Sequence, residues 1–599
     1  MQQHPIHYRV EPADPAGHLF SIQLTASRPD PEGQHFSLPA WIPGSYMIRD
    51  FAKNIVTINA ECSGKTVALT KSDKQTWQAA PCDGALIINY TVYAWDLSVR
   101  SAHFDQSHAY FNGTSLFLRV HGQDETPCSV ELQPPEGDAY KNWRVATTLP
   151  LNGAPLWGFG GYQSSNYDEL IDHPVEMADF TLIEFEAKGT PHAVAITGKH
   201  YADCDRIATD LKKICGTEIE LFGELPEMDH YLFQVMAVGD GYGGLEHRSS
   251  TSLLCSRDNF PQHGDKRMSD GYRSFLGLCS HEYFHTWNVK RIKPTDYLPY
   301  NLQQETHTPL LWFFEGVTSY YDDLFLYRSG CINKESYLEL LGQQITRLLR
   351  TPGREKQTVS ESSFDTWTKL YKADENAPNA IVSYYNKGAL IALCLDLTIR
   401  KESGGKSSLD DVMRALWQQH GKPLIGVTPE GLETFIESVS GVELRSFFNH
   451  TLRTTEELPL AELLSEFGVE YKLRPSEGLE DKGGKPGSSN PSPPYTGIRF
   501  SANSDRIGAK VAAVLNNSPA HHAGISANDI LLAVDGLKTN KEKFDKQLAN
   551  MNIDSGVTIH GFRRDELMQY QIVLGKQPTN SAFLIDDKTK RVELWLGGH

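Results

Sequence analysis

Two histidines and a glutamate in this 599-residue chain have the types and the spacing for metal chemistry. They stand in His281-Glu282-Tyr283-Phe284-His285, the H-E-x-x-H pattern. On a helix, residues four apart share a face, so both imidazoles can bind one Zn²⁺ while Glu282 reaches a water activated by the ion. This geometry suits a hydrolase.

A third metal ligand should accompany the histidine pair, because a catalytic zinc usually has three protein ligands and one open position. Glu315 is the candidate, since it lies among bulky apolar residues in Trp312-Phe313-Phe314-Glu315-Gly316. A buried carboxylate without a partner is costly, and metal ligation would satisfy it. A core glutamate held by a salt bridge is the alternative.

The first part of the chain has the pattern of a β domain. Residues 1 to about 185 contain alternating or β-branched runs, such as Leu19 to Leu24 and Ser115 to Val120, separated by turn-rich clusters. We expect these runs to be strands of an all-β, sandwich-like domain.

Helical signals surround the H-E-x-x-H pattern and continue to about residue 465. Tyr201 to Cys215 has helical spacing, whereas Tyr231 to Val238 is an apolar run of strand length. Thr428 before Pro429 is typical of a helix start, with a hydroxyl at the N-cap and proline in the first turn. These signals predict a mixed α/β region followed by a large helical one.

The composition changes between residues 474 and 494 to glycine, serine, proline and charge. Such a stretch cannot bury enough apolar surface to offset its ordering entropy, so we expect an exposed linker or a mobile loop. A compact C-terminal module should follow it.

Charge and cysteine usage exclude several classes of partner and location. The chain has 57 Lys+Arg and 75 Asp+Glu, a formal charge of −18, without the basic surface that nucleic acids and anionic membranes require. Apolar stretches such as Ile391 to Leu397 are far shorter than the roughly 20 residues of a membrane helix. The nine cysteines form no C-x-x-C pair and no secretory signal is evident. We therefore expect a cytoplasmic protein with neither nucleic-acid nor membrane partners.

The motifs together resemble a known family. The W-x-x-E-G motif around Glu315 is similar to that of the zinc peptidases typified by aminopeptidase N, but Glu315 follows His285 by thirty positions, a longer interval than in those enzymes. This interval, with the segments His-Thr-Trp-Asn-Val-Lys-Arg-Ile-Lys-Pro at 285–294 and Trp-Ile-Pro-Gly-Ser-Tyr at 41–46, is instead similar to the glycyl aminopeptidase family. That family is a relative with a C-terminal PDZ domain.

The resemblance extends to the binding of the substrate N-terminus. Gly243-Gly244-Leu245-Glu246-His247 resembles the G-x-M-E-N motif of aminopeptidase N, which implies that Glu246 receives the free α-ammonium and that Gly243 and Gly244 line the substrate site. A fixed opposite charge binds the amine and sets the register for removing one residue. His247 replaces the usual asparagine, and an ordinary strand-edge carboxylate is the alternative for Glu246.

A tyrosine downstream is the implied donor to the reacting carbonyl oxygen. Tyr385-Asn386-Lys387-Gly388 resembles the Tyr-x-Lys-Gly segment of the same enzymes. A phenol aimed at a developing oxyanion lowers the barrier more than it aids substrate binding. Tyr384 is the neighbouring candidate, and the spacing to Lys387-Gly388 favours Tyr385.

The C-terminal module resembles the PDZ domains attached to bacterial proteases. Residues 495–500, 517–525 and 528–536 carry this similarity. Such domains usually accept an extended peptide as an added strand and capture its terminal carboxylate. A packed accessory domain without peptide affinity is the alternative.

These observations predict a multidomain α+β protein with six segments. They are an N-terminal β-sandwich-like domain at 1–185, a thermolysin-like α/β catalytic domain at 186–405, a helical segment at 406–473, a linker or mobile loop at 474–494, a PDZ-like β domain at 495–580 and a C-terminal tail at 581–599.

The resemblance implies an aminopeptidase with one zinc ion, which acts on peptides with a free N-terminus and prefers Gly or Ala. Zinc would be held by His281, His285 and Glu315, with Glu282 as general base and Tyr385 as oxyanion donor. Two alternatives remain at this point. One is a zinc endopeptidase of the same fold, and the other is a peptide-binding PDZ adaptor that has lost catalysis.

Overall fold

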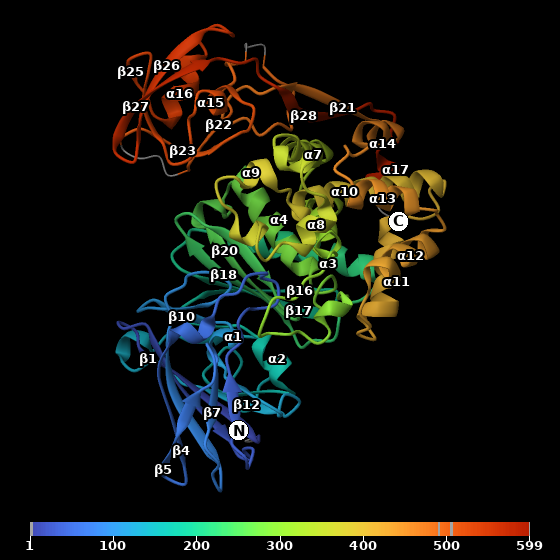
Figure 1. Cartoon of the computed structure of the whole chain (residues 1–599). Helices are drawn as coiled ribbons and strands as arrows, with labels where there is room; N and C mark the ends of the chain where they lie inside the picture. The colour runs from blue at the N-terminus through green and yellow to red at the C-terminus, as the bar shows by residue number, and fades with distance from the viewer. Residues whose placement is uncertain (1–3, 489–491, 503–506, 598–599) are drawn as a thin grey trace. The chain divides into compact units, whose positions relative to one another are not determined.

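The computed structural model describes residues 4–488, 492–502 and 507–597, and Figure 1 shows the order of their elements along the chain. By internal packing the chain divides into two compact units. The first unit contains residues up to 306, with 329–331 and 416–427, and the second contains 307–328, 332–415 and the residues from 428 onward. The predicted multidomain α+β class is confirmed, because a β-rich part, a mainly helical part and a second β-rich part follow one another.

The N-terminal part of the first unit is built from three sheets. The largest has the order β14-β12-β1-β2-β8-β4-β5. Its strands are β1 (Ile6–Asp14), β2 (Leu19–Ala26), β4 (Ile55–Cys62), β5 (Lys65–Val67), β8 (Leu86–Tyr93), β12 (Cys128–Leu132) and β14 (Gly160–Ser164). Burial alternates along β2 and β8, as expected for strands with one face on a core.

The two smaller sheets have four strands each. One has the order β13 (Arg144–Ala146), β15 (Val175–Ala178), β10 (His108–Phe111) and β9 (Ala102–Phe104). The other has the order β11 (Arg119–Val120), β3 (His35–Ser37), β7 (Thr76–Ala79) and β6 (Leu69–Lys71).

The run Ser115 to Val120 differs from the strand predicted for it. It begins inside the short helix α1 (Gly113–Leu116) and only its end forms β11. A Cβ on Gly113 would lie 2.7 Å from the Cα of Ile171, at the end of helix α2 (Tyr167–Ile171), so this backbone packs directly on a distant segment. Tertiary packing therefore decides the local structure here.

The rest of the first unit is a five-stranded sheet with two long helices. The order is β16 (Thr181–Ala187), β17 (Thr190–Thr197), β18 (Tyr231–Val238), β20 (Ser250–Ser256) and β19 (Tyr242–Glu246). β17, β18 and β20 are parallel, while β19 runs antiparallel at one edge. The predicted strand at 231–238 is confirmed, and the predicted helix at 201–215 lies largely within α3 (Cys204–Phe222). The second long helix is α4 (Asp270–Phe284).

The second unit begins with a bundle of helices. They are α5 (Leu311–Phe314), α6 (Gly316–Arg328), α7 (Lys334–Leu349), α8 (Val359–Phe364), α9 (Ala377–Ala380), α10 (Tyr384–Glu402), most of α11 (Leu409–Leu416), α12 (Pro429–Ser440), α13 (Arg445–Arg453) and α14 (Leu460–Glu466), with α17 (Glu593–Leu596) near the end of the chain. The predicted start of α12 is confirmed, because the Thr428 side chain accepts a hydrogen bond from the Gly431 amide and Pro429 opens the helix.

Helix α10 is the core helix of this bundle. The segment Ala377–Glu402, which includes it, is the one described segment with the length and composition to cross a membrane, but 72% of its most apolar window is buried within the fold. Helices α6 and α10 approach closely through two glycines, since a Cβ on Gly316 would lie 2.6 Å from the Cα of Gly388. This contact fixes Glu315 and Tyr385, which stand next to these helix starts.

The C-terminal module has its own sheet and core. The order is β22 (Ile498–Phe500), β23 (Ala509–Val514), β24 (Ile530–Val534), β26 (Gly556–Arg563) and β27 (Glu566–Val573), with β25 (Leu537–Lys538) paired to β24. Helices α15 (Pro519–His522) and α16 (Lys541–Leu548) complete it, and Phe544 and Leu548 of α16 join its buried cluster.

The first half of the segment predicted as a linker, residues 474–484, makes ordered contacts. Strand β21 (Val469–Pro475) pairs with β28 (Thr579–Asp586) as a separate two-stranded sheet. Arg474 forms two hydrogen bonds with the Asp481 carboxylate, at 2.6 and 3.0 Å, and the Gly484 amide donates to Ala582. Residues 489–491 of this segment and residues 598–599 of the predicted tail lie outside the described residues, so both assignments stay predictions.

Candidate active site

Helix α4 presents the two histidines at its C-terminal end. The helix starts at Ser269, whose side chain accepts a hydrogen bond from the Tyr272 amide, and it buries Phe275 and Cys279 on the way. His285 is the residue after the helix and keeps helical backbone angles of φ −60° and ψ −17°. The i, i+4 relation is therefore preserved, and the Nε2 atoms of His281 and His285 lie 3.2 Å apart.

The tautomer of His285 fits metal ligation. Its Nδ1 atom lies 2.5 Å from the carbonyl oxygen of Asn288, which can only accept a hydrogen bond. Nδ1 therefore carries the proton and Nε2 keeps its lone pair, the arrangement common in metal-binding histidines. Because two facing nitrogen lone pairs repel, the pair needs a proton or a cation between its Nε2 atoms.

Two carboxylates join this pair within the first unit. Ligand atoms of Glu246, Glu282 and His285 all lie within 4.8 Å of one another, and these residues are only 4%, 5% and 1% exposed. Glu246 ends the edge strand β19, so its side chain can turn from the sheet toward α4. Its Oε1 atom is buried and has no hydrogen-bond partner among the residues that the structure describes.

Both carboxylates rest against glycine backbone. A Cβ on Gly44, which has φ +90°, would lie 2.5 Å from Oε2 of Glu246, and a Cβ on Gly244 would lie 2.0 Å from Oε1 of Glu282. Arg100 secures the second contact, because its Nη2 donates to the Gly244 carbonyl at 3.0 Å. Gly44 belongs to the Trp-Ile-Pro-Gly-Ser-Tyr segment, and this contact gives the segment a role that sequence reasoning missed. The Pro-Gly pair, typical of a turn with positive φ, was the available signal.

The two residues that follow Glu246, His247 and Arg248, belong to a charged network centred on Asp172. Asp172 accepts hydrogen bonds from Lys290 Nζ at 2.6 Å and from the Arg248 amide at 2.9 Å. Although burial acts to raise it, the pKa of Asp172 is held well below its usual range by Lys290 and Arg248. His247, which lies 3.7 Å from Asp172, has a pKa lowered by burial and is neutral near pH 7. The network fixes the turn after β19 and thereby the position of Glu246.

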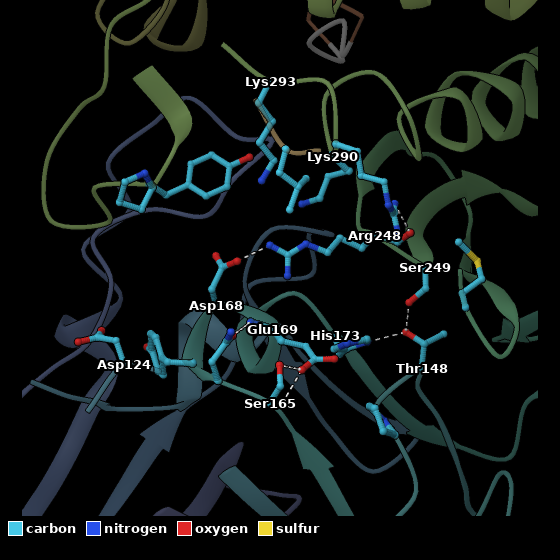
Figure 2. Close-up of a pocket in the computed structure, with 18 of the residues that line it drawn as sticks. Asp124, Thr148, Ser165, Asp168, Glu169, His173, Arg248, Ser249, Lys290 and Lys293 are labelled. Carbon is cyan, nitrogen blue, oxygen red and sulfur yellow. Dashed lines mark hydrogen bonds and ion pairs between the residues drawn. The ribbon is translucent and has the colours of Figure 1, made fainter. Parts of the chain in front are cut away.

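A cavity of about 960 Å³ lies in the same unit and is lined by Arg248, Lys290 and Lys293 among others (Figure 2). Figure 2 shows Arg248 reaching toward Asp168, with which it forms an ion pair. Burial, with the neighbouring charges of Arg248 and Lys290, lowers the pKa of Lys293 to about 7. None of the predicted catalytic or metal-binding residues is among the described residues that line this cavity.

The second unit carries the other two predicted site residues, Glu315 and Tyr385. Glu315 lies between α5 and α6 and is 2% exposed. Tyr384 is fully buried, its hydroxyl is 2.9 Å from that of Thr366, and its pKa is raised by burial and then by Tyr371 and Glu315. Tyr385 is partly exposed, with its hydroxyl 3.2 Å from that of Tyr371. Of the two candidate donors, Tyr385 is the more accessible.

Comparison with known proteins assigns the family. Three family profiles match successive parts of the chain: the peptidase M61 N-terminal domain at residues 7–179, M61 glycyl aminopeptidase at 274–391 and a PDZ domain at 494–574. An aminopeptidase N family protein from Idiomarina loihiensis has a crystal structure with 42% identity and a TM-score of 0.95, and the match covers 99% of this chain and 100% of that one. The chain belongs to the M61 glycyl aminopeptidase family.

Membership confirms the predicted family and the predicted enzyme class, so this M61 family member is a metallopeptidase with a C-terminal PDZ domain. An M1 zinc metallopeptidase from Deinococcus radiodurans also matches, with 13% identity and a TM-score of 0.49, over 76% of this chain and 95% of that one. No curated protein matches the chain.

Proposed function

We propose that this chain is a zinc-dependent aminopeptidase that removes single N-terminal residues from peptides. The observation that carries the proposal is the buried Glu246 carboxylate, whose Oε1 lacks a partner among the described residues while Glu282 lies within 4.8 Å. A desolvated carboxylate favours an ammonium group as its ligand.

The closeness of these two carboxylates supports removal of one residue at a time. In an amino acid the α-nitrogen and the carbonyl carbon are only about 2.5 Å apart. A peptide with its ammonium group on Glu246 would therefore present its first peptide bond beside Glu282. An endopeptidase would need an open cleft at the position of Glu246.

One zinc ion would be held by His281, His285 and Glu315. The His285 tautomer and the 3.2 Å spacing of the two Nε2 atoms suit the histidine pair for this role, and the burial of Glu315 suits a carboxylate ligand. When bound, zinc would polarise the scissile carbonyl and lower the pKa of a water molecule.

The chain's own residues would then move the protons and steady the developing charge. Glu282 takes a proton from the attacking water and delivers it to the nitrogen of the leaving amine. Tyr385 donates a hydrogen bond to the carbonyl oxygen as negative charge grows on it. Its partial exposure supports Tyr385 over Tyr384, whose hydroxyl is engaged with Thr366.

The preference for N-terminal Gly or Ala is part of the proposal. It rests on family membership and agrees with a carboxylate pair packed against Gly44 and Gly244. The PDZ domain would bind a peptide C-terminus, and the enzyme would act in the cytoplasm on peptides.

Matched peptide libraries with free and with acetylated N-termini test this function, each with and without a chelator. We expect cleavage of free Gly and Ala peptides, its loss with chelator and its recovery with added zinc. Equal cleavage of the acetylated peptides would establish the endopeptidase alternative, and no cleavage of either library by zinc-loaded protein would favour the adaptor.

A further inference from the structure

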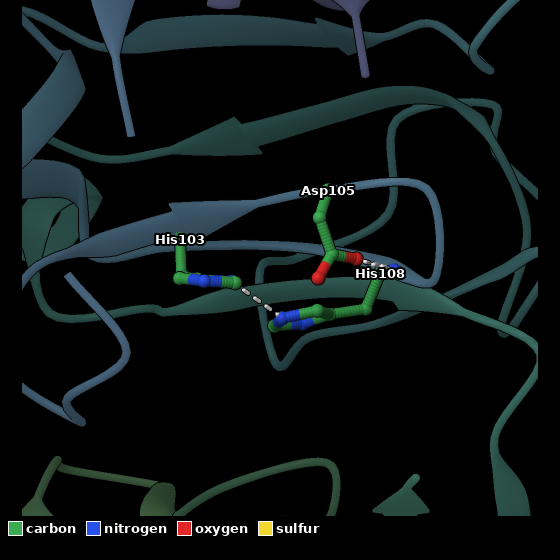
Figure 3. A group of neighbouring side chains, drawn as sticks. All are labelled: His103, Asp105 and His108. Carbon is green, nitrogen blue, oxygen red and sulfur yellow. Dashed lines mark hydrogen bonds between the residues drawn. The ribbon is translucent and has the colours of Figure 1, made fainter. Parts of the chain in front are cut away.

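A second group of potential metal ligands lies on the β9–β10 hairpin, within the first unit and outside the catalytic residues. Ligand atoms of His103, Asp105 and His108 lie within 4.8 Å of one another, and both histidines are buried. Figure 3 shows the facing imidazoles, with His103 Nδ1 and His108 Nε2 2.8 Å apart, and the Asp105 carboxylate beside them.

The register of the sheet explains why these side chains meet. His103 of β9 is paired with Tyr110 of β10, and Tyr110 is paired with Glu176 of β15. Side chains alternate along a strand, so His108, two residues before Tyr110, shares its face. His103, His108 and Glu176 therefore project from the same side of three adjacent strands.

Glu176 orients His108 as a ligand. The Nδ1 atom of His108 lies 3.2 Å from Oε1 of Glu176, which also accepts a hydrogen bond from Thr197 Oγ1 at 2.9 Å. A carboxylate on one ring nitrogen leaves the other nitrogen available for a metal and increases its basicity. This carboxylate–histidine pair is buried, with both side chains almost inaccessible to solvent.

Hydrogen bonds within the turn hold the Asp105 carboxylate in place. The Ser107 amide and the Ser107 hydroxyl both donate to it, each at 2.6 Å. These bonds go to Oδ1, while Oδ2 has no hydrogen bond to a described residue.

The turn that carries Asp105 borders a surface hollow. Asp105, Gln106 and Ser107 line a surface hollow of about 370 Å³ together with His18. A solvent molecule from this hollow can complete the coordination of an ion with three protein ligands.

We propose that His103, Asp105 and His108 form a second metal site for a divalent transition ion such as Zn²⁺, distinct from the H-E-x-x-H site. Two imidazole nitrogens and one carboxylate oxygen match the ligand preferences of zinc and its neighbours in the first transition row. The ion would tie the hairpin turn to both strands and, through Glu176, to β15.

The test uses full-length protein with His281→Ala and His285→Ala, which removes the histidine pair of the catalytic site. The protein is loaded with Zn²⁺ or Co²⁺, desalted and analysed for metal content and visible absorption. We expect one ion per chain and a Co²⁺ spectrum, both lost on addition of His103→Gln.

Two milder variants test the site without relying on His103→Gln, which replaces a buried side chain and could disturb folding. Asp105→Asn at the partly exposed turn should weaken Co²⁺ binding, and Glu176→Gln should lower the affinity about 10- to 100-fold. Gln106→Ala, an exposed neighbour in the same turn, should bind as the parent does. The proposal is overturned if the parent double variant retains no ion, as a proton shared by His103 and His108 would predict. Binding that is unaffected by His103→Gln and Asp105→Asn also overturns it.

Discussion

Two histidine pairs in the first unit differ in the element that brings them together. His281 lies in α4 and His285, four residues on, directly follows it with helical backbone angles, so their meeting is fixed by helical periodicity. His103 and His108 are five residues apart on two strands, and they meet because of the turn and the register of the hairpin. The helical pair is readable from sequence, whereas the hairpin pair becomes evident only once strand pairing is known.

The chemistry around the two pairs also differs. The helical pair lies beside Glu246 and Glu282, so a substrate amine and a general base can act there. The hairpin pair has the carboxylate of Glu176 on the far side of His108, where it orients that imidazole as a ligand. We therefore expect catalysis at the first pair and structural binding at the second.

Glu282→Gln should show the largest difference in kcat between a variant of the catalytic site and a variant of the hairpin site. Loss of the general base lowers kcat by about 10²- to 10⁴-fold, because the glutamine amide cannot accept the proton from water. Steady-state kinetics on a free glycyl peptide measure it, with metal content as a check that zinc remains bound. His103→Gln is the matched control and should leave kcat close to the parent value. A similar loss in both variants would refute the division of roles.

Tyr385→Phe should have the second largest effect on activity. We expect kcat to fall by about 10²- to 10³-fold, because one hydrogen-bond donor to the oxyanion is lost. Tyr384→Phe is the control, since the Tyr384 hydroxyl is buried against Thr366. Rapid-quench or steady-state kinetics distinguish the two. If Tyr384→Phe has the greater effect on kcat at unchanged stability, the assignment of the donor is wrong.

Glu246→Gln should lower kcat/KM for free peptides by about 10- to 100-fold, the value of a hydrogen bond to a charged group. An N-acetylated substrate lacks the ammonium group, so its slow cleavage should hardly change. The ratio of the two kcat/KM values is the measurement. An unchanged ratio would make Glu246 an ordinary strand-edge carboxylate.

Gly44→Ala should have the smallest effect on activity, with a loss of about 1–3 kcal/mol in the free energy of unfolding. The added Cβ would collide with the Glu246 carboxylate at a backbone angle of φ +90°. Chemical denaturation measures the stability, and kcat/KM for free peptides should fall less than in Glu246→Gln. Gly64→Ala, at positive φ without a neighbour within 4 Å, controls for backbone strain alone. Equal losses of kcat/KM in Gly44→Ala and Gly64→Ala would show that the contact between Gly44 and Glu246 does not contribute to activity.

The sequence predicted what local periodicity and capping determine. The strand Tyr231–Val238, the helix start at Thr428 and the helical histidine pair are all set by residues within a turn or two of each other. Contacts between distant segments could not be predicted. The run expected as a strand begins in helix α1, where Gly113 packs against Ile171. Gly44 packs against the carboxylate of Glu246, which comes from a strand much later in the chain.

The catalytic zinc ligands remain the central claim, and Glu315 is the ligand to test. In a His103→Gln background, which removes the proposed second site, the zinc content of protein with Glu315 is compared with that of Glu315→Gln after equal loading and desalting. We predict one zinc per chain with Glu315, and loss of both zinc and aminopeptidase activity in the variant. Retention of one zinc with full activity in Glu315→Gln would contradict the account and make Glu315 a structural core residue.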